Sequence, residues 1–250
     1  MCQKIEKIDI FDNGSIPMMK IRDATKEEID EKRKNGKFSG MRDMHIKEKE
    51  CDTNNVKELV EYGMEKGFHN GLGNAVDERL KKNQQYQNAQ SKKTPPSILK
   101  YQKTNKLELQ DAVNKEIQDY GVIIHKDQVL YHGGLLEGLS ENSSITTTRT
   151  LSTTLNPAVA HTECYHKWKA YEANEININI LTVKDEDIKG FVFNNRTSMK
   201  HEREILFERN IKLVMKNKQL CGYSEVEDKS GNTKNVPKYI TEIEIYKSDY

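Results

Sequence analysis

Two glutamates lie two residues apart at the start of an apolar run in the segment Met199-Lys200-His201-Glu202-Arg203-Glu204-Ile205-Leu206-Phe207. Because side chains alternate along a β-strand, Glu202 and Glu204 are predicted to project from the same face. Each carboxylate raises the cost of burying the other, so such a pair on an apolar strand indicates a function. The polar run Asn194 to Ser198 before the pair predicts an open sheet edge. Acidic residues that alternate on a strand are more often its solvent face, so the interpretation depends on the rest of the chain.

Two further segments predict strands that end in polar groups. Val129-Leu130-Tyr131-His132-Gly133-Gly134 reads as a short strand ending at a glycine pair, where backbone can approach a ligand closely and where His132 lies. Thr150-Leu151-Ser152-Thr153-Thr154-Leu155 reads as a strand with three consecutive hydroxyl side chains. Asn156 and Pro157 then predict the start of a helix, as its N-cap and its first residue. Each segment taken alone is more often structural.

Taken in order, the three segments are aromatic-His-Gly, Leu-Ser-Thr-Thr and Glu-x-Glu followed by apolar residues. This order resembles the mono-ADP-ribosyltransferase family, specifically the arginine–serine–glutamate branch that includes bacterial exoenzyme toxins and phage enzymes. The resemblance covers roughly residues 97–250. It implies an α+β fold with an ADP-ribosyltransferase-like mixed or antiparallel β-sandwich core.

The chain departs from the pattern of that branch at two positions. His132 stands where the branch has arginine, and a histidine there is typical of the diphtheria-toxin and poly(ADP-ribose) polymerase branch. Thr150 stands where an aromatic residue commonly precedes the Ser-Thr-Ser strand. A neutral imidazole cannot reproduce the forked contacts of a guanidinium, so adenosine and phosphate binding are expected to differ in detail.

The resemblance implies catalysis by three residues. The bond between ribose and nicotinamide in NAD would break through a ribosyl oxocarbenium ion, which needs nearby negative charge. Glu204 is implied as the catalytic glutamate, its carboxylate accepting a hydrogen bond from the ribose 2′-hydroxyl. Glu202 would face the incoming nucleophile and favours an arginine acceptor, because a carboxylate can hold a guanidinium bidentately. Ser152 would orient Glu204 or contact the nicotinamide ribose.

The resemblance also implies the contacts to NAD, which would enter as a co-substrate without a metal. The implied NAD-binding residues are Tyr131, His132, Gly133, Ser152, Thr153 and Thr154. His132 is expected to donate to the adenosine ribose or the pyrophosphate, and backbone near Gly133 to hold the nicotinamide amide. Asn194 to His201 is expected to form a target-recognition loop. Arg196 within it is expected either to touch phosphate or to be solvated.

Length and charge limit the classes of protein that fit. The chain has 250 residues, enough for one large domain or two small ones. Its 40 basic and 39 acidic residues create no basic field that would favour nucleic acid. No run approaches the ~20 apolar residues of a membrane span, and the N-terminus lacks the apolar core of a secretory signal peptide. We expect a soluble protein that acts in a cytoplasm, including a host's after secretion or injection by another route.

The cysteines and histidines predict neither disulfides nor a metal site. Four cysteines are widely scattered, which fits a reducing compartment. His161, Cys164 and His166 lie close in sequence, but on a helix only the first two share a face, and no fourth ligand has suitable spacing.

The order of predicted elements favours two regions. Residues 1–96 are expected to be mostly helical, a lobe or accessory module, with a capping box at Thr25 and Glu28 and an apolar helix closed by Gly67. A boundary is predicted at Pro95-Pro96. Residues 97–250 are expected to form the catalytic domain, with one helix over 107–120 and another over 157–173. Strands are predicted at 129–132, 150–155, 176–183, 190–193, 204–208, 211–215 and 238–246.

Three functions remain open at this stage. The leading hypothesis is a mono-ADP-ribosyltransferase acting on a protein, as a toxin, virulence effector or phage-encoded modifier. An alternative on the same fold is NAD hydrolysis or ADP-ribosylation of nucleic acid, of which the balanced charge disfavours the latter. The third is an inactive fold that binds a partner protein, which the histidine at position 132 favours and the retained glutamates oppose.

Overall fold

A computed structural model of the chain describes residues 3–104, 106–194 and 202–248. The helices are α1 (Lys26–Lys34), α2 (Val56–Lys66), α3 (Leu72–Lys82), α4 (Gln84–Ala89), α5 (Pro96–Thr104), α6 (Gln110–Tyr120), α7 (Pro157–Tyr165) and α8 (Lys169–Ala173). The strands are β1 (Ile16–Asp23), β2 (His45–Thr53), β3 (Val122–Ile123), β4 (Val129–Gly133), β5 (Ser144–Thr146), β6 (Leu151–Thr154), β7 (Ile176–Val183), β8 (Lys189–Val192), β9 (Glu204–Phe207), β10 (Ile211–Glu227) and β11 (Thr233–Lys247). No helix in these ranges is long and apolar enough to cross a membrane.

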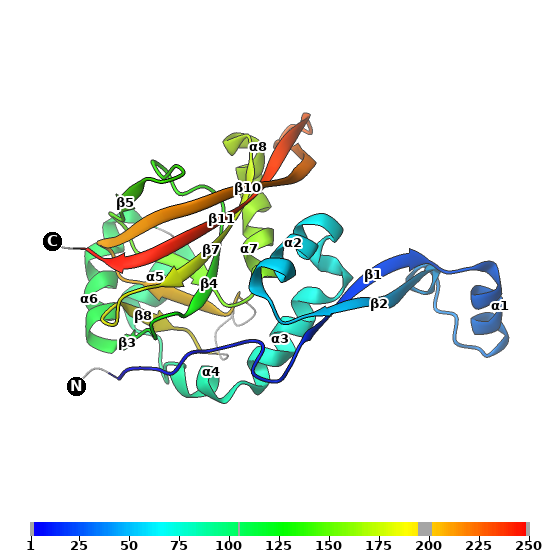
Figure 1. Cartoon of the computed structure of the whole chain (residues 1–250), viewed down its shortest axis with the longest axis horizontal. Coiled ribbons are helices and arrows are strands. Elements are labelled where there is room, and N and C mark those ends of the chain that lie inside the picture. The colour runs from blue at the N-terminus through cyan, green and yellow to red at the C-terminus, as the bar shows by residue number, and fades with distance from the viewer. Residues whose placement is uncertain (1–2, 105, 195–201, 249–250) are drawn as a thin grey trace.

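A nine-stranded sheet forms the body of the molecule, in the order β3-β8-β9-β6-β4-β7-β11-β10-β5 (Figure 1). Strands β7 and β11 are parallel, and the other neighbours are antiparallel. One residue pair, Tyr131 with Thr154, joins β4 to β6. The sheet therefore consists of two halves that meet at this pair, and the predicted α+β class with a mixed sheet is confirmed.

Both halves of the sheet owe their stability to buried strands. Strand β7 is buried along nearly its whole length, as expected for a central strand covered on both faces. Helices α5 and α6 cover β8 and β9 through a separate apolar cluster of Ile98, Val113, Ile117, Phe191, Phe193 and Leu206. Strands β10 and β11 form a long hairpin. The sequence pattern predicted only its residues 211–215 and 238–246, where apolar residues alternate.

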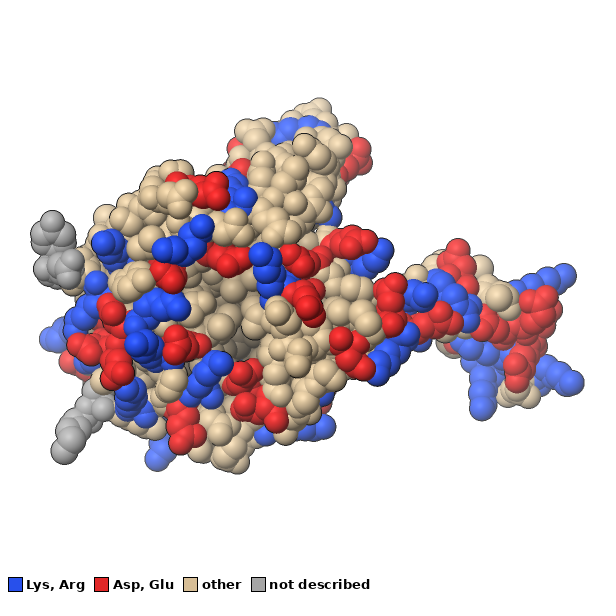
Figure 2. Space-filling view, viewed as in Figure 1, with Lys and Arg blue, Asp and Glu red and all other residues tan. Residues whose placement is uncertain are grey.

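The N-terminal region contains a hairpin that the sequence analysis missed. Strands β1 and β2 pair antiparallel and project from the body, with α1 at the far end (Figure 1). The capping box of Thr25 and Glu28 at the start of α1 is confirmed, but the flanking segments are strands and not helices. Because most of β2 is exposed, it has no apolar alternation to reveal a strand. Figure 2 shows both signs of charge interspersed along this hairpin.

The rest of the N-terminal region packs into the same core as the sheet. One apolar cluster contains Ile8, Leu59 and Leu72 together with Ile178 and Ile205. The predicted helix over 157–173 is interrupted between α7 and α8, where Lys167 and Trp168 have positive φ angles of 51° and 62°. Few non-glycine residues adopt this conformation, so periodicity alone could not reveal the break.

Candidate active site

The site lies where the two halves of the sheet separate beyond the Tyr131–Thr154 pair. The His132 ring bridges the opening, and its Nδ1 lies 2.8 Å from the Ser152 carbonyl oxygen. A carbonyl only accepts, so Nδ1 carries the proton and Nε2 is the acceptor of the neutral ring. Burial lowers the pKa of His132, which keeps the ring neutral at pH 7. The neutral ring then has no proton to donate from Nε2, which corrects the expected donation to the adenosine ribose or the pyrophosphate.

A buried asparagine holds the backbone on either side of Gly133. Asn179 on β7 is 2% exposed, and its Nδ2 donates to the carbonyl oxygens of His132 at 3.0 Å and Gly134 at 2.8 Å. Thr241 in turn donates to the Asn179 side-chain oxygen. The conformation of the His-Gly-Gly turn is therefore fixed by contacts from two neighbouring strands, β7 and β11.

Glu204 is the first residue of β9 and is buried at 9% exposure. The Ser152 hydroxyl donates to its Oε1 at 2.7 Å, and the Gln102 amide donates to its Oε2 at 3.1 Å. Ser152 and Glu204 come from neighbouring strands, β6 and β9, while Gln102 reaches across from α5. The contact between Ser152 and Glu204 that the resemblance implies is present, and it fixes the orientation of the carboxylate.

The environment of Glu204 makes its ionisation costly. Burial is the main reason that the pKa of Glu204 rises to about 7, and the nearby charges of Glu202 and Glu163 add to the rise. The hydrogen bonds from Ser152 and Gln102 favour the ionised form and limit the shift. A carboxyl with a pKa near the working pH, in an opening of the sheet, is typical of a functional site.

This shift predicts that Glu204 lowers the stability of the fold as the pH rises. Below pH about 4.5 both the folded and unfolded chains carry the proton; between about 4.5 and about 7 only the folded chain retains it. The unfolded state is therefore favoured progressively across this window, up to about 3 kcal/mol at higher pH. Glu204→Gln is expected to increase the free energy of unfolding at pH 8 by much more than at pH 5. Urea denaturation at both pH values, beside the exposed control Glu225→Gln, measures the difference.

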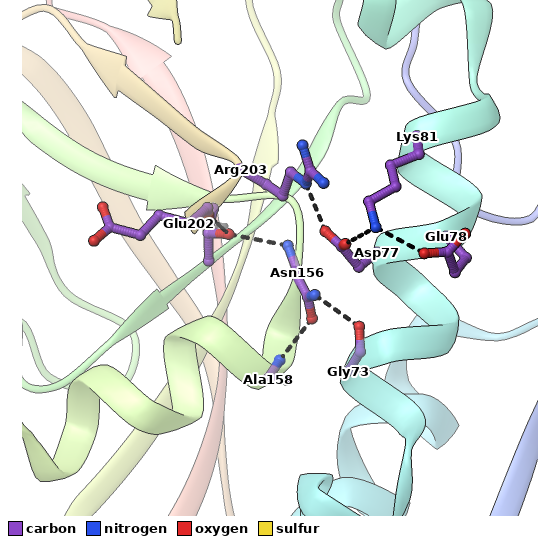
Figure 3. Close-up of polar contacts among 9 residues, drawn as sticks. Gly73, Asp77, Glu78, Lys81, Asn156, Ala158, Glu202 and Arg203 are labelled. Atoms are coloured by element: carbon purple, nitrogen blue, oxygen red, sulfur yellow. Dashed lines mark hydrogen bonds and ion pairs between the residues drawn. The ribbon is translucent and has the colours of Figure 1, made fainter. Parts of the chain in front are cut away.

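Glu202 does not lie on the strand with Glu204, which corrects the predicted common face. The strand begins at Glu204, and Arg203 has a φ of 49°, so the backbone turns between the two glutamates. The Thr154 hydroxyl donates to the Glu202 carbonyl oxygen. The Arg203 side chain is buried, and its Nε lies 2.6 Å from Oδ1 of Asp77 on α3 (Figure 3). The two carboxylates remain close enough for Glu202 to raise the pKa of Glu204.

A pocket of about 360 Å³ lies beside this turn, between helices α3 and α7. Its lining includes Gly73 and Asp77 from α3, Thr162 and Glu163 from α7, and Glu202. Of the eleven described residues that line the pocket, three are acidic and none is basic. Asp77 is paired with Arg203 and Lys81, so Glu163 and Glu202 supply the negative charge that favours a cationic group. Since Glu163 and Glu202 also act on the pKa of Glu204, the pocket lies next to the buried carboxylate.

The other predicted NAD-binding residues occupy varied positions. Tyr131 is 2% exposed and belongs to the apolar core. The Thr153 hydroxyl donates to the Ile205 carbonyl oxygen, and that of Thr154 to Glu202. A Cβ on Gly133 would lie 1.9 Å from the Ala160 carbonyl oxygen of α7. Contacts of these residues to NAD stay predictions.

The predicted target-recognition loop is mostly outside the described residues. Its first residue, Asn194, donates from its side-chain amide to the Ser91 carbonyl oxygen at 3.0 Å. Residues 195–201, including Arg196, are not described.

The candidate metal cluster of the sequence has other contacts. The His161 ring packs against Phe68 and Tyr165, with 5.0 Å between ring centroids in each pair. The Cys164 thiol is buried and donates to the Asn177 carbonyl oxygen at 2.9 Å. Within the described part of the chain, no three His, Cys, Asp or Glu side chains form a group that could hold a metal ion.

Four residues of the site were missed by the sequence analysis: Gln102, Asn179, Arg203 and Asp77. Gln102 and Asp77 lie on helices more than 100 residues from Glu204, and no spacing rule connects them to it. Asn179 does carry a signal, because an asparagine in the middle of the apolar strand Ile176–Val183 must find hydrogen-bond partners.

No family model and no curated protein matches this chain. Among solved structures it is similar to Vis toxin, an ADP-ribosyltransferase from Vibrio splendidus, at 16% identity and a TM-score of 0.35, covering 90% of this chain and 88% of that one. It is similar to Plx2a, an ADP-ribosyltransferase toxin from Paenibacillus larvae, at 11% identity and a TM-score of 0.34, covering 76% and 80%. It also matches the enzymatic component C2-I of the C2 toxin from Clostridium botulinum, at 12% identity and a TM-score of 0.35.

The match to C2-I covers 60% of this chain but only 39% of C2-I. Vis and Plx2a carry the name of the family that the sequence motifs of this chain resemble.

Proposed function

We propose that the chain is an NAD-dependent mono-ADP-ribosyltransferase that transfers ADP-ribose to a protein side chain and releases nicotinamide. The observation that carries this proposal is the buried Glu204 carboxylate, oriented by Ser152 at 2.7 Å, on the strand beside β6, which a single residue pair joins to β4. A buried carboxylate held by hydrogen bonds is suited to stabilise a cation that develops beside it.

The proposed reaction breaks the bond between C1′ of the ribose and the nicotinamide nitrogen. The electron pair of that bond leaves with nicotinamide as a neutral molecule, and positive charge develops on the ribosyl carbon and ring oxygen. Ionised Glu204 would accept a hydrogen bond from the ribose 2′-hydroxyl and stabilise this charge.

The acceptor would reach C1′ from the acidic pocket between α3 and α7. An arginine side chain fits its charge, because Glu202 can hold a guanidinium and orient one nitrogen for attack. The attacking nitrogen would form the new bond to C1′ and pass its proton to Glu202. His132, with Nδ1 bound to the Ser152 carbonyl, leaves Nε2 as an acceptor for a ribose hydroxyl or a bridging water.

Incubation of the purified chain with labelled NAD and a cell lysate tests the proposal. A labelled protein band, absent with Glu204→Gln, is the expected result, and mapping the label identifies the acceptor. Nicotinamide release without a band would favour NAD hydrolysis, and a labelled nucleic acid would favour that acceptor. If neither a labelled band nor nicotinamide release were observed, the proposal would be contradicted and a partner-binding module would be favoured.

Glu202→Gln is expected to separate transfer from NAD cleavage and to move the pH dependence. Because ionised Glu204 is required, NAD cleavage should rise with pH and reach half its maximum near pH 7. Removing the charge of Glu202 lowers the pKa of Glu204, so the half-maximum should move to lower pH while transfer to a guanidino acceptor falls. The pH profile of kcat/KM for nicotinamide release measures the shift; an unchanged midpoint would contradict the assigned charge interaction.

A further inference from the structure

The turn between Glu202 and Glu204 is held by a closed set of contacts that begins and ends on α3 (Figure 3). At one end, the Asn156 side-chain amide donates to the Gly73 carbonyl oxygen at 3.0 Å. The Asn156 N–H donates to the Thr154 hydroxyl at 3.0 Å, and that hydroxyl donates to the Glu202 carbonyl oxygen. Each contact fixes the position of the next, from the helix to the turn.

The set closes through the next residue of the turn. Arg203 directs its side chain back to α3, where its Nε lies 2.6 Å from Asp77 Oδ1. Asp77 and Gly73 are four residues apart and so share one face of the helix. The Arg203 carbonyl oxygen also accepts from the Leu155 N–H at 3.2 Å, which ties the turn to the end of β6.

The ion pair between Arg203 and Asp77 is buried and is supported by further contacts. The Arg203 side chain is 4% exposed, and its guanidinium also lies over the Tyr86 ring at 5.8 Å. Asp77 accepts a second contact from Lys81 at 3.0 Å. Burial alone raises the pKa of Asp77, but the contacts from Arg203 and Lys81 lower it below its usual value. Removing one partner of a buried pair leaves the other charge uncompensated, which is strongly destabilising.

We infer that α3 is part of the active site, and that Asp77, through Arg203, is the positioning residue that sets the turn presenting Glu202 to the acceptor pocket. The positive φ of Arg203 is unfavourable for a side-chain-bearing residue and needs surrounding contacts to persist. Glu204 is held independently, because β9 pairs with β6 and Ser152 binds its carboxylate. Loss of Asp77 should therefore disturb Glu202 more than Glu204.

The inference rests on the proposed function for its kinetic test. Asp77→Asn is expected to lower transfer to agmatine, a guanidino acceptor, by roughly 10-fold more than it lowers NAD hydrolysis, because a small misplacement of a positioning group is costly. Asp77→Glu, which keeps the carboxylate, should restore part of the ratio of transfer to hydrolysis that Asp77→Asn loses. Glu78→Gln, an exposed neighbour that contacts only Lys81 in Figure 3, is the matched control.

Hydrogen exchange gives a second readout that does not depend on catalysis. In Asp77→Asn, the Leu155 amide and the peptide 202–207 are expected to exchange at least 10-fold faster than in the native chain, with no change in Glu78→Gln. Should Asp77→Asn fail to fold, Arg203→Lys removes the Nε contact while keeping the charge. Unchanged exchange with an unchanged transfer-to-hydrolysis ratio would overturn the inference. Absence of NAD cleavage by the native chain would instead reject the proposed function, and exchange alone would then decide the role of Asp77.

Discussion

Glu204→Gln is expected to reduce NAD cleavage by roughly 10³-fold, the magnitude typical of losing an oriented group that stabilises charge in a transition state. The amide has nearly the shape of the carboxylate: its oxygen can accept from Gln102, and its NH2 can donate to the Ser152 hydroxyl, which reverses the direction of that contact. It carries no negative charge to offset the developing ribosyl cation. Initial rates of nicotinamide release at pH 8, where the native carboxylate is ionised, measure the loss.

The same variant should keep its fold, which separates a catalytic loss from unfolding. Removal of a carboxylate that is costly to ionise is expected to stabilise the chain at pH 8, so a more stable but inactive protein is the combined signature. Glu225→Gln on the exposed surface of β10 should change neither rate nor stability. NAD cleavage within 10-fold of the native rate in Glu204→Gln would exclude Glu204 as the catalytic glutamate.

Sequence reasoning predicted the centre of this candidate site from signals that are local. The Ser-Thr-Thr strand and the glutamate at the start of β9 could be recognised from a few adjacent residues, and antiparallel pairing places Ser152 and Glu204 in contact. The burial of Glu204 follows from the apolar residues after it, all of which are buried in β9. Where one strand carries both the polar residue and the apolar run, alternation along that strand is sufficient to predict the strand and the burial of its polar residue.

The same reasoning failed where the geometry depends on distant residues. The spacing of Glu202 and Glu204 predicted one common face, but Arg203 is drawn to Asp77, 126 residues earlier, and the backbone turns instead. Gln102 reaches Glu204 from a helix whose sequence shows nothing unusual. Such contacts are decided by packing between helices and sheet, which no local pattern encodes.

The glycine pair at the end of β4 was noticed for a reason that the structure revises. Close approach to a ligand was predicted, but the close neighbour of Gly133 is helix α7, which packs against β4. Gly134, in contrast, has a φ of 108° and open space where a Cβ would stand. The two glycines are therefore needed for different reasons, one for packing and one for backbone conformation.

Gly133→Ala is consequently expected to destabilise the fold severely, by about 3 kcal/mol or more, because the added methyl group would overpack a buried site. Its Cβ would lie 1.9 Å from the Ala160 carbonyl oxygen and 2.8 Å from the Ala160 carbonyl carbon, which are helix backbone atoms and cannot rotate away. For a chain of this size the loss corresponds to a fall in melting temperature of roughly 10 °C, measurable by circular dichroism. Gly134→Ala meets no atom within 4 Å and should cost only its backbone strain. A melting temperature of Gly133→Ala equal to that of Gly134→Ala would show that α7 does not pack against β4 as described. The placement of the acidic pocket, which α7 lines, would then be wrong as well.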